Sequence, residues 1–194
     1  KAFISRENDR FKEFLMELAK SKDANAPVVA KVNARTLQPH EVVSAYFSRG
    51  SNADPMLDAM WEGILERITG DLNEFFCLVD VSSSMEGIPM QVAIALGLLV
   101  ATKSTGPFAN AMVTFHETPQ FITLKETTLH ERVQEVKALP WGGSTEIHRA
   151  FTLILNQAKQ YHLRQEDLPK YFLILSDMQF DAADRRWRSN LESA

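Results

Sequence analysis

The chain has 194 residues, of which 45% are hydrophobic and 24% are charged. This balance is typical of a globular protein and excludes a disordered or collagen-like chain. Its 21 basic residues are outnumbered by 25 acidic ones, giving a formal net charge of −4. That charge argues against a polycationic nucleic-acid binder but leaves room for a local basic patch. The length suits one fair-sized domain, or one domain with a helical extension.

The single cysteine, Cys77, lies in an apolar run and cannot form an intramolecular disulfide. We expect it to be a small buried side chain in a reducing compartment, which predicts a cytoplasmic protein. The longest uncharged apolar stretch, residues 92–101, is about half of what a membrane-spanning helix needs, and no signal-peptide pattern opens the chain. We therefore expect neither a membrane span nor a membrane partner.

Residues 1–70 are predicted to form an α-helical region. The N-terminal part has one amphipathic stripe at helical spacing, made by Phe11, Phe14, Leu15 and Leu18. Pro39 and the Asp54–Pro55 pair stand where helices begin, with proline at the first helical position and aspartate as a cap. The helix predicted from Pro55 to Ile68 is followed by a break at residues 69–71, which predicts a boundary near residue 70.

Residues 71–194 alternate between apolar runs of strand length and of helix length. Strands are predicted at 75–79, 111–115, 121–124 and 171–175, and helices at 89–101, 129–139, 146–163 and near the C-terminus. The runs at 75–79 and 171–175 are wholly apolar, as in strands buried on both faces. This order predicts an α/β domain, with a parallel-rich sheet, helices on both faces and one hairpin at an edge.

Oxygen-bearing side chains gather where these strands end. The first strand runs into Asp80, Ser82 and Ser84, the loop 141–145 contains Ser144 and Thr145, and the last strand ends in Ser176 and Asp177. In such sheets, ligands bind at the carboxyl edge of the central strands. Hard oxygen donors without histidine or cysteine suit Mg²⁺, which keeps some of its waters. The sequence therefore predicts an Mg²⁺ site with an open coordination position.

This pattern of residues resembles the metal ion-dependent adhesion site of von Willebrand factor A domains, over residues 73–181. The resemblance implies a Rossmann-like A-domain fold and five metal-binding residues, namely Asp80, Ser82, Ser84, Thr145 and Asp177. In that family Asp177 usually acts through water, and a carboxylate from a protein partner completes the shell. The expected cofactor is Mg²⁺, with Mn²⁺ and Ca²⁺ as alternatives.

Further segments resemble an intracellular family related to the Ro/TROVE RNA-binding proteins, at residues 80–85, 93–97, 141–145 and 175–181. In those proteins a helical-repeat domain precedes the A domain and packs with it, and residues 37–41 are similar to the end of such a region. The resemblance implies an alternative function as an RNA-binding ribonucleoprotein component. The helical region offers some positive charge for it, interleaved with acidic residues, from Lys12, Lys20, Lys22, Lys31 and Arg35.

An A domain usually adds two strands and a closing helix after the strand that carries Asp177. We therefore expect the A domain to be incomplete here, with an exposed sheet edge that the remainder of a longer protein or another chain would cover.

The leading expectation is a non-enzymatic interaction module. A simpler interpretation makes Asp80, Ser82 and Ser84 only the cap of a helix. A hydrolase would use Ser82 or Ser84 as nucleophile, or Asp80 for phosphotransfer, but the sequence has no GxSxG motif and no histidine placed as the base. Trp141 is expected to be a packing residue, and the histidines are expected to be solvated or hydrogen-bonded.

Overall fold

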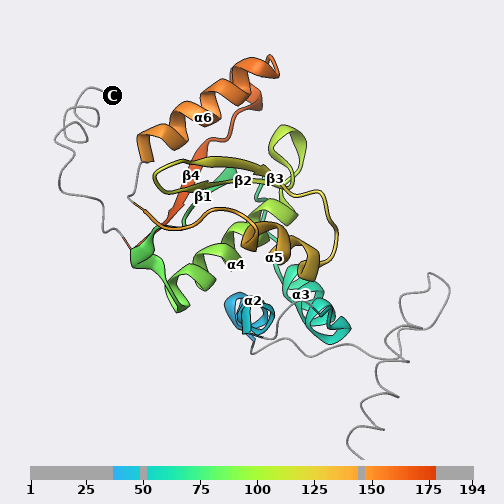
Figure 1. Cartoon of the computed structure of the whole chain (residues 1–194). Helices are drawn as coiled ribbons and strands as arrows, with labels where there is room; N and C mark the ends of the chain where they lie inside the picture. The colour runs from blue at the N-terminus through green and yellow to red at the C-terminus, as the bar shows by residue number, and fades with distance from the viewer. Residues whose placement is uncertain (1–36, 49–51, 144–146, 178–194) are drawn as a thin grey trace, which may run out of the picture.

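A computed structural model describes residues 37–48, 52–143 and 147–177 of the chain. In this part the protein is a mixed α/β fold, with a four-stranded sheet between helices (Figure 1). The strands are β1 (Phe75–Asp80), β2 (Ala111–Phe115), β3 (Gln120–Thr123) and β4 (Tyr171–Leu175), in the spatial order β3-β2-β1-β4. All four strands were expected from the sequence, and the arrangement is compatible with a Rossmann-like fold.

The sheet is parallel except at one edge. β1 runs parallel to both β2 and β4, whereas β2 and β3 form an antiparallel hairpin, which confirms the expected edge hairpin. In the register of β1 and β4, Val79 pairs with Leu175. The two strands therefore end level with one another, and the residues that follow them emerge at the same edge of the sheet.

Helices cover both faces of the sheet. On one face lies α4 (Ile88–Lys103), with α2 (Pro39–Ser48), α3 (Pro55–Arg67) and α5 (Leu129–Lys137) packed around it, and on the other lies α6 (Ile147–Gln160) (Figure 1). Three short 3₁₀ helices complete the described elements, η1 (Ser83–Met85), η2 (Gly106–Phe108) and η3 (Gln165–Asp167). None of the helices in the described part of the chain is long and apolar enough to cross a membrane.

Alternate residues of β1 pack into two different hydrophobic cores, one on each face of the sheet. Cys77 and Val79 pack on the side of α4, and Phe76 and Leu78 pack on the side of α6. Both sets are almost completely buried, which explains the uninterrupted apolar run in the sequence. The same burial on both faces was expected for β4 and is wrong for it among the described residues, because β4 lies at an edge of the sheet and its side chains are exposed or half-buried. The burial expected for Cys77 is confirmed, and it raises the pKa of the thiol to about 12.

The two described helices before β1 start at the prolines that the sequence indicated. α2 starts at Pro39 and α3 at Pro55, and the Asp54 side chain accepts a hydrogen bond of 2.9 Å from the Met56 amide. The buried Tyr46 hydroxyl joins the two helices by donating to the Asp54 carbonyl and to Asp58 Oδ1, each at 2.9 Å. Burial is the main cause that raises the pKa of Tyr46.

The division at residue 70 stays a prediction. Residue 70 lies between α3 and β1, but α2 and α3 share one hydrophobic core with α4. The helix expected around Phe11–Leu18, the basic residues of segment 1–36 and the helix expected near the C-terminus lie outside the described residues.

Candidate metal centre

Asp80 ends β1, and its carboxylate is buried at the carboxyl edge of the sheet. The residue is 1% exposed. Its Oδ1 accepts a hydrogen bond of 2.9 Å from the Ser82 amide, and its Oδ2 accepts one of 2.6 Å from the Ser176 hydroxyl. In the described part of the chain, no lysine, arginine or histidine forms an ion pair with it. A carboxylate removed from water in this way is costly, and a nearby positive charge would stabilise it.

Ser82 and Ser84 place two hydroxyl groups in the turn that follows Asp80. Their Oγ atoms are 3.2 Å apart. Ser82 is buried and Ser84 is exposed, so this pair of oxygens runs from the interior to the surface. The turn therefore offers a carboxylate and two hydroxyls within five residues.

The helix-cap interpretation of these residues fits Asp80 but not Ser82. Asp80 accepts from the amide two residues on, as aspartate does in an Asx turn. Ser82 stands at the N-cap position of η1, yet its side chain makes no capping hydrogen bond there. The Ser82 hydroxyl faces Ser84 instead.

The loop before α6 is joined to this turn by two hydrogen bonds from its backbone amides. The Gly142 amide donates to the Val81 carbonyl at 2.8 Å, and the Gly143 amide donates to Ser83 Oγ at 3.3 Å. Gly142 has φ 99°, and a Cβ built there would lie 3.3 Å from Ser83 Oγ, so the close approach favours glycine. Thr145, the ligand expected from this loop, lies outside the described residues.

Asp177 lies beside the turn, on the strand-end segment that follows β4. Its amide lies 3.2 Å from the Met85 sulfur, to which it donates. Asp177 lines a groove between α4 and β4 together with Met85 and Ser176. The residue that contacts Asp80 directly is the preceding one, Ser176. The structure thus brings Asp80, Ser82 and Ser84 into one turn, with Asp177 on the neighbouring segment, and the ligand role of Asp177 stays a prediction.

Ser176 is not among the predicted metal ligands, yet it contacts Asp80 directly. Its position could have been predicted from the pairing of the two strands, because parallel strands that end level place the residues after their ends side by side. That pairing could be used only once the register of β1 and β4 was known. The Ser176 hydroxyl and the Ser82 amide together orient the Asp80 carboxylate, because each donates to a different one of its two oxygens.

His116 follows β2 at the same edge of the sheet. The preceding Phe115 carbonyl accepts from the Val81 amide at 3.1 Å, and His116 Nδ1 accepts from the Thr118 amide at 3.4 Å. Its Nε2 is buried and has no hydrogen-bond partner in the described part of the protein. The expectation that the histidines are solvated or hydrogen-bonded is therefore wrong for this atom, and also for His130 Nε2.

The donor set fits a hard divalent cation better than a soft one. It combines one buried carboxylate with hydroxyl groups, which are ligands for Mg²⁺. The described residues contain no group of three or more histidine, cysteine, aspartate or glutamate side chains that could hold a metal. A site here would therefore depend on hydroxyl oxygens and water.

Trp141 packs as expected but is not fully covered. Its ring stacks on Phe47 with centroids 5.6 Å apart, and its Nε1–H donates to the Val136 carbonyl at 3.2 Å. The residue is still 36% exposed, because one side of the ring faces a cavity.

Comparison with known proteins gives a family and one relative. A family model described as a domain of unknown function, DUF7788, matches residues 75–193. The chain is 38% identical over 176 residues to "Uncharacterized protein L728" of Acanthamoeba polyphaga mimivirus, a match that covers 90% of this chain and 29% of that protein. The chain thus spans less than a third of that relative's length. No solved structure matches.

The family match begins at the first residue of β1 and includes the Asp80–Ser84 turn, Thr145, and the Ser176–Asp177 segment. It covers more than half of the chain. The protein therefore belongs to the DUF7788 family.

Proposed function

We propose that this protein is a von Willebrand A-like interaction module that binds Mg²⁺ and captures a carboxylate from a partner protein. Asp80, Ser82 and Ser84 would hold the ion, with Thr145 and Asp177 contributing directly or through water. The observation that carries the proposal is the Asp80 carboxylate, which is 1% exposed and has no ion-pairing partner in the described residues.

The surroundings of Asp80 fit this role. Each carboxylate oxygen accepts one hydrogen bond, so the side chain is fixed while each oxygen keeps a further lone pair. The neighbouring hydroxyls at 3.2 Å from one another add neutral oxygen donors. With Asp80 as the directly bound carboxylate and Asp177 acting through water, the bound ion keeps net positive charge, and such an ion attracts an external carboxylate.

The location at the carboxyl edge also supports a binding role. Ser84 is exposed and belongs to η1, next to the surface loop 141–143. A carboxylate on the surface of another protein could reach this position without any opening of the core. We propose no chemical step, because the described histidines include none that hydrogen-bonds to Ser82 or Ser84.

The proposal is tested by water-proton relaxation with Mn²⁺ as the probe ion. Protein-bound Mn²⁺ that keeps exchangeable waters raises the relaxation rate, and we expect one saturable site that Mg²⁺ displaces. Adding N-acetylaspartate should lower the enhancement because its carboxylate replaces water. N-acetylasparagine, which lacks the side-chain carboxylate, is the matched control and should have a smaller effect.

Asp80→Asn should abolish the enhancement, and Glu66→Gln, on the exposed side of α3, should leave it unchanged. If Asp80→Asn bound Mn²⁺ as tightly as the unaltered protein does, the proposed metal site would be refuted. Binding that is normal but indifferent to N-acetylaspartate would refute carboxylate capture alone.

A further inference from the structure

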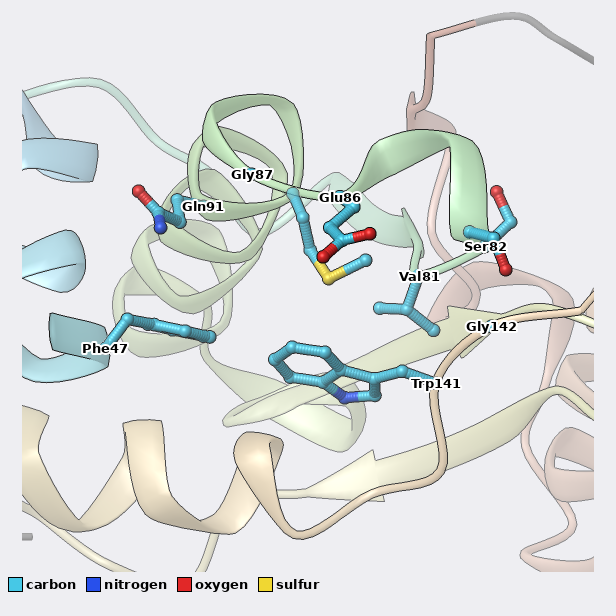
Figure 2. A pocket seen from close by; sticks show the side chains of 10 residues that line it. Phe47, Val81, Ser82, Glu86, Gly87, Gln91, Trp141 and Gly142 are labelled. Atoms are coloured by element: carbon cyan, nitrogen blue, oxygen red, sulfur yellow. The ribbon is translucent and has the colours of Figure 1, made fainter. Parts of the chain in front are cut away.

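A cavity of about 280 Å³ opens beside the Asp80–Ser84 turn, and the Asp80 carboxylate does not line it. Its walls come from four places in the chain: the end of α2, the Val81–Ser83 turn, the start of α4 and the loop before α6 (Figure 2). The volume is just below the range of ~300–1,000 Å³ that is usual for small-molecule sites. It is therefore a space for one side chain or a comparably small group.

Two aromatic rings form one wall of the cavity. Figure 2 shows Phe47 and Trp141 reaching toward one another from α2 and from the loop before α6. Their rings are stacked, with centroids 5.6 Å apart and an angle of 30° between the planes. The Trp141 ring is held in place by its Nε1–H bond to Val136 and by the Gly142–Val81 backbone bond next to it.

Among the described residues, Glu86 supplies the only charged side chain that lines the cavity. Figure 2 shows its carboxylate turned inward, toward the Trp141 ring. In the described part of the chain, this carboxylate has no hydrogen bond or ion pair. The Met90 thioether also lines the cavity, whereas Gln91, at its edge, already accepts a hydrogen bond from Ser44.

An unpaired carboxylate opposite an aromatic wall is complementary to an organic cation. A cation is attracted both by the negative face of an aromatic ring and by a carboxylate. The Phe47 ring already has the Lys137 ammonium 5.4 Å from its centroid, while none of the described cations lies over Trp141. Trp141 is therefore the ring that can receive a further cation.

We propose that this cavity binds the cationic side chain of a lysine or arginine from a polypeptide partner, between the Trp141 ring and the Glu86 carboxylate. A neutral apolar side chain would fill the same volume but would gain no attraction from the Glu86 carboxylate or from the negative face of the Trp141 ring. The proposal does not depend on the metal site, although Ser82 lies at the border of both.

The test uses small probes and is run in EDTA, so that the metal plays no part. Nα-acetyl-lysine methylamide and Nα-acetyl-arginine methylamide are titrated into ¹⁵N- and methyl-¹³C-methionine-labelled protein, with Nα-acetyl-norleucine methylamide as the neutral control. The reporters are the indole N–H of Trp141 and the methyl group of Met90, assigned with Trp141→Phe and Met90→Leu. We expect saturable shifts of both reporters with at least one cationic probe, and much smaller shifts with norleucine.

Glu86→Gln should weaken binding by about fivefold, as expected for removal of one partly exposed charge partner. Trp141→Leu, followed through Met90, should weaken it further, and Glu66→Gln should bind as the unaltered protein does. Equal shifts with norleucine would overturn the proposal in favour of an apolar pocket. An unchanged affinity in Glu86→Gln, or no shift with either cation, would also overturn it.

Discussion

At the scale of single residues, the buried charge of Asp80 is the feature that local structure does not explain. Its two hydrogen bonds satisfy the geometry of the carboxylate, but they come from neutral donors and leave its charge uncompensated within the described residues. A buried residue whose only task was to cap a turn could be asparagine at lower cost. The proposed Mg²⁺ site would account for an aspartate rather than an asparagine at this position.

Cys77 permits a prediction on pH. Because burial raises the pKa of its thiol to about 12, the folded protein holds this proton more tightly than the unfolded chain, in which the pKa is about 8.5. The stability that this difference provides is fully present below about pH 8.5 and is lost as the pH rises toward 12. Between pH 8.5 and 10 we expect the free energy of unfolding to fall by about 1.5 kcal/mol, measured by urea denaturation.

Cys77→Ala is the control for that measurement. It removes the thiol, so its free energy of unfolding should fall less steeply over the same pH interval, whatever its stability at pH 7. Tyr46, whose pKa is also raised, acts in the same direction in both proteins and cancels in the comparison. Identical slopes for the two proteins would show that the thiol is not buried as described.

At the scale of elements, the contact of α4 with the sheet depends on one glycine. A Cβ built at Gly97 would lie 2.6 Å from Val79 Cγ2 and 3.0 Å from the Met112 sulfur. Val79 is β-branched and belongs to a central strand, so its methyl group has little freedom to move. Glycine thus allows α4 to approach β1 closely, which fixes the strand end that carries Asp80.

Gly97→Ala should destabilise the protein even though alanine favours helices. Overpacking costs about 1–3 kcal/mol, and the gain in helix propensity returns about 1 kcal/mol. We expect a net loss of up to about 2 kcal/mol in the free energy of unfolding, measured by chemical denaturation. Gly70→Ala is the matched control, because nothing lies within 4 Å of a Cβ there. A Gly97→Ala protein more stable than Gly70→Ala would contradict the described packing.

Elements were also the level at which the sequence was most informative. The apolar runs at β1 and β4, the hairpin of β2 and β3, and the proline starts of α2 and α3 all follow from local patterns. What local patterns could not provide are contacts across elements. The Ser176–Asp80 hydrogen bond depends on the register of two strands, and the Phe47–Trp141 pair joins residues almost a hundred positions apart.

At the scale of the whole molecule, the described sheet has β4 at one edge, with Tyr171, Phe172 and Ile174 more than a third exposed. The opposite edge is the short strand β3. Exposed apolar side chains on an edge strand are typical of a surface that another element or another chain covers. The expected incomplete A domain, whose remainder would cover this edge, stays a prediction.

The most direct test of the metal site compares the thermal unfolding of the unaltered protein and Asp80→Asn, each in EDTA and in Mg²⁺. Asparagine can keep both hydrogen bonds of Asp80, accepting from the Ser82 amide and donating to the Ser176 hydroxyl, so only the charge is removed. In EDTA we expect Asp80→Asn to unfold at the higher temperature, because the uncompensated buried charge is gone. At 100 times its dissociation constant, Mg²⁺ should stabilise the unaltered protein by about 2.7 kcal/mol, a rise in midpoint of about 5–10 °C, and leave Asp80→Asn unchanged. A Mg²⁺ effect that is equal in the two proteins, or absent from both, would contradict the assignment of the buried carboxylate to a metal site.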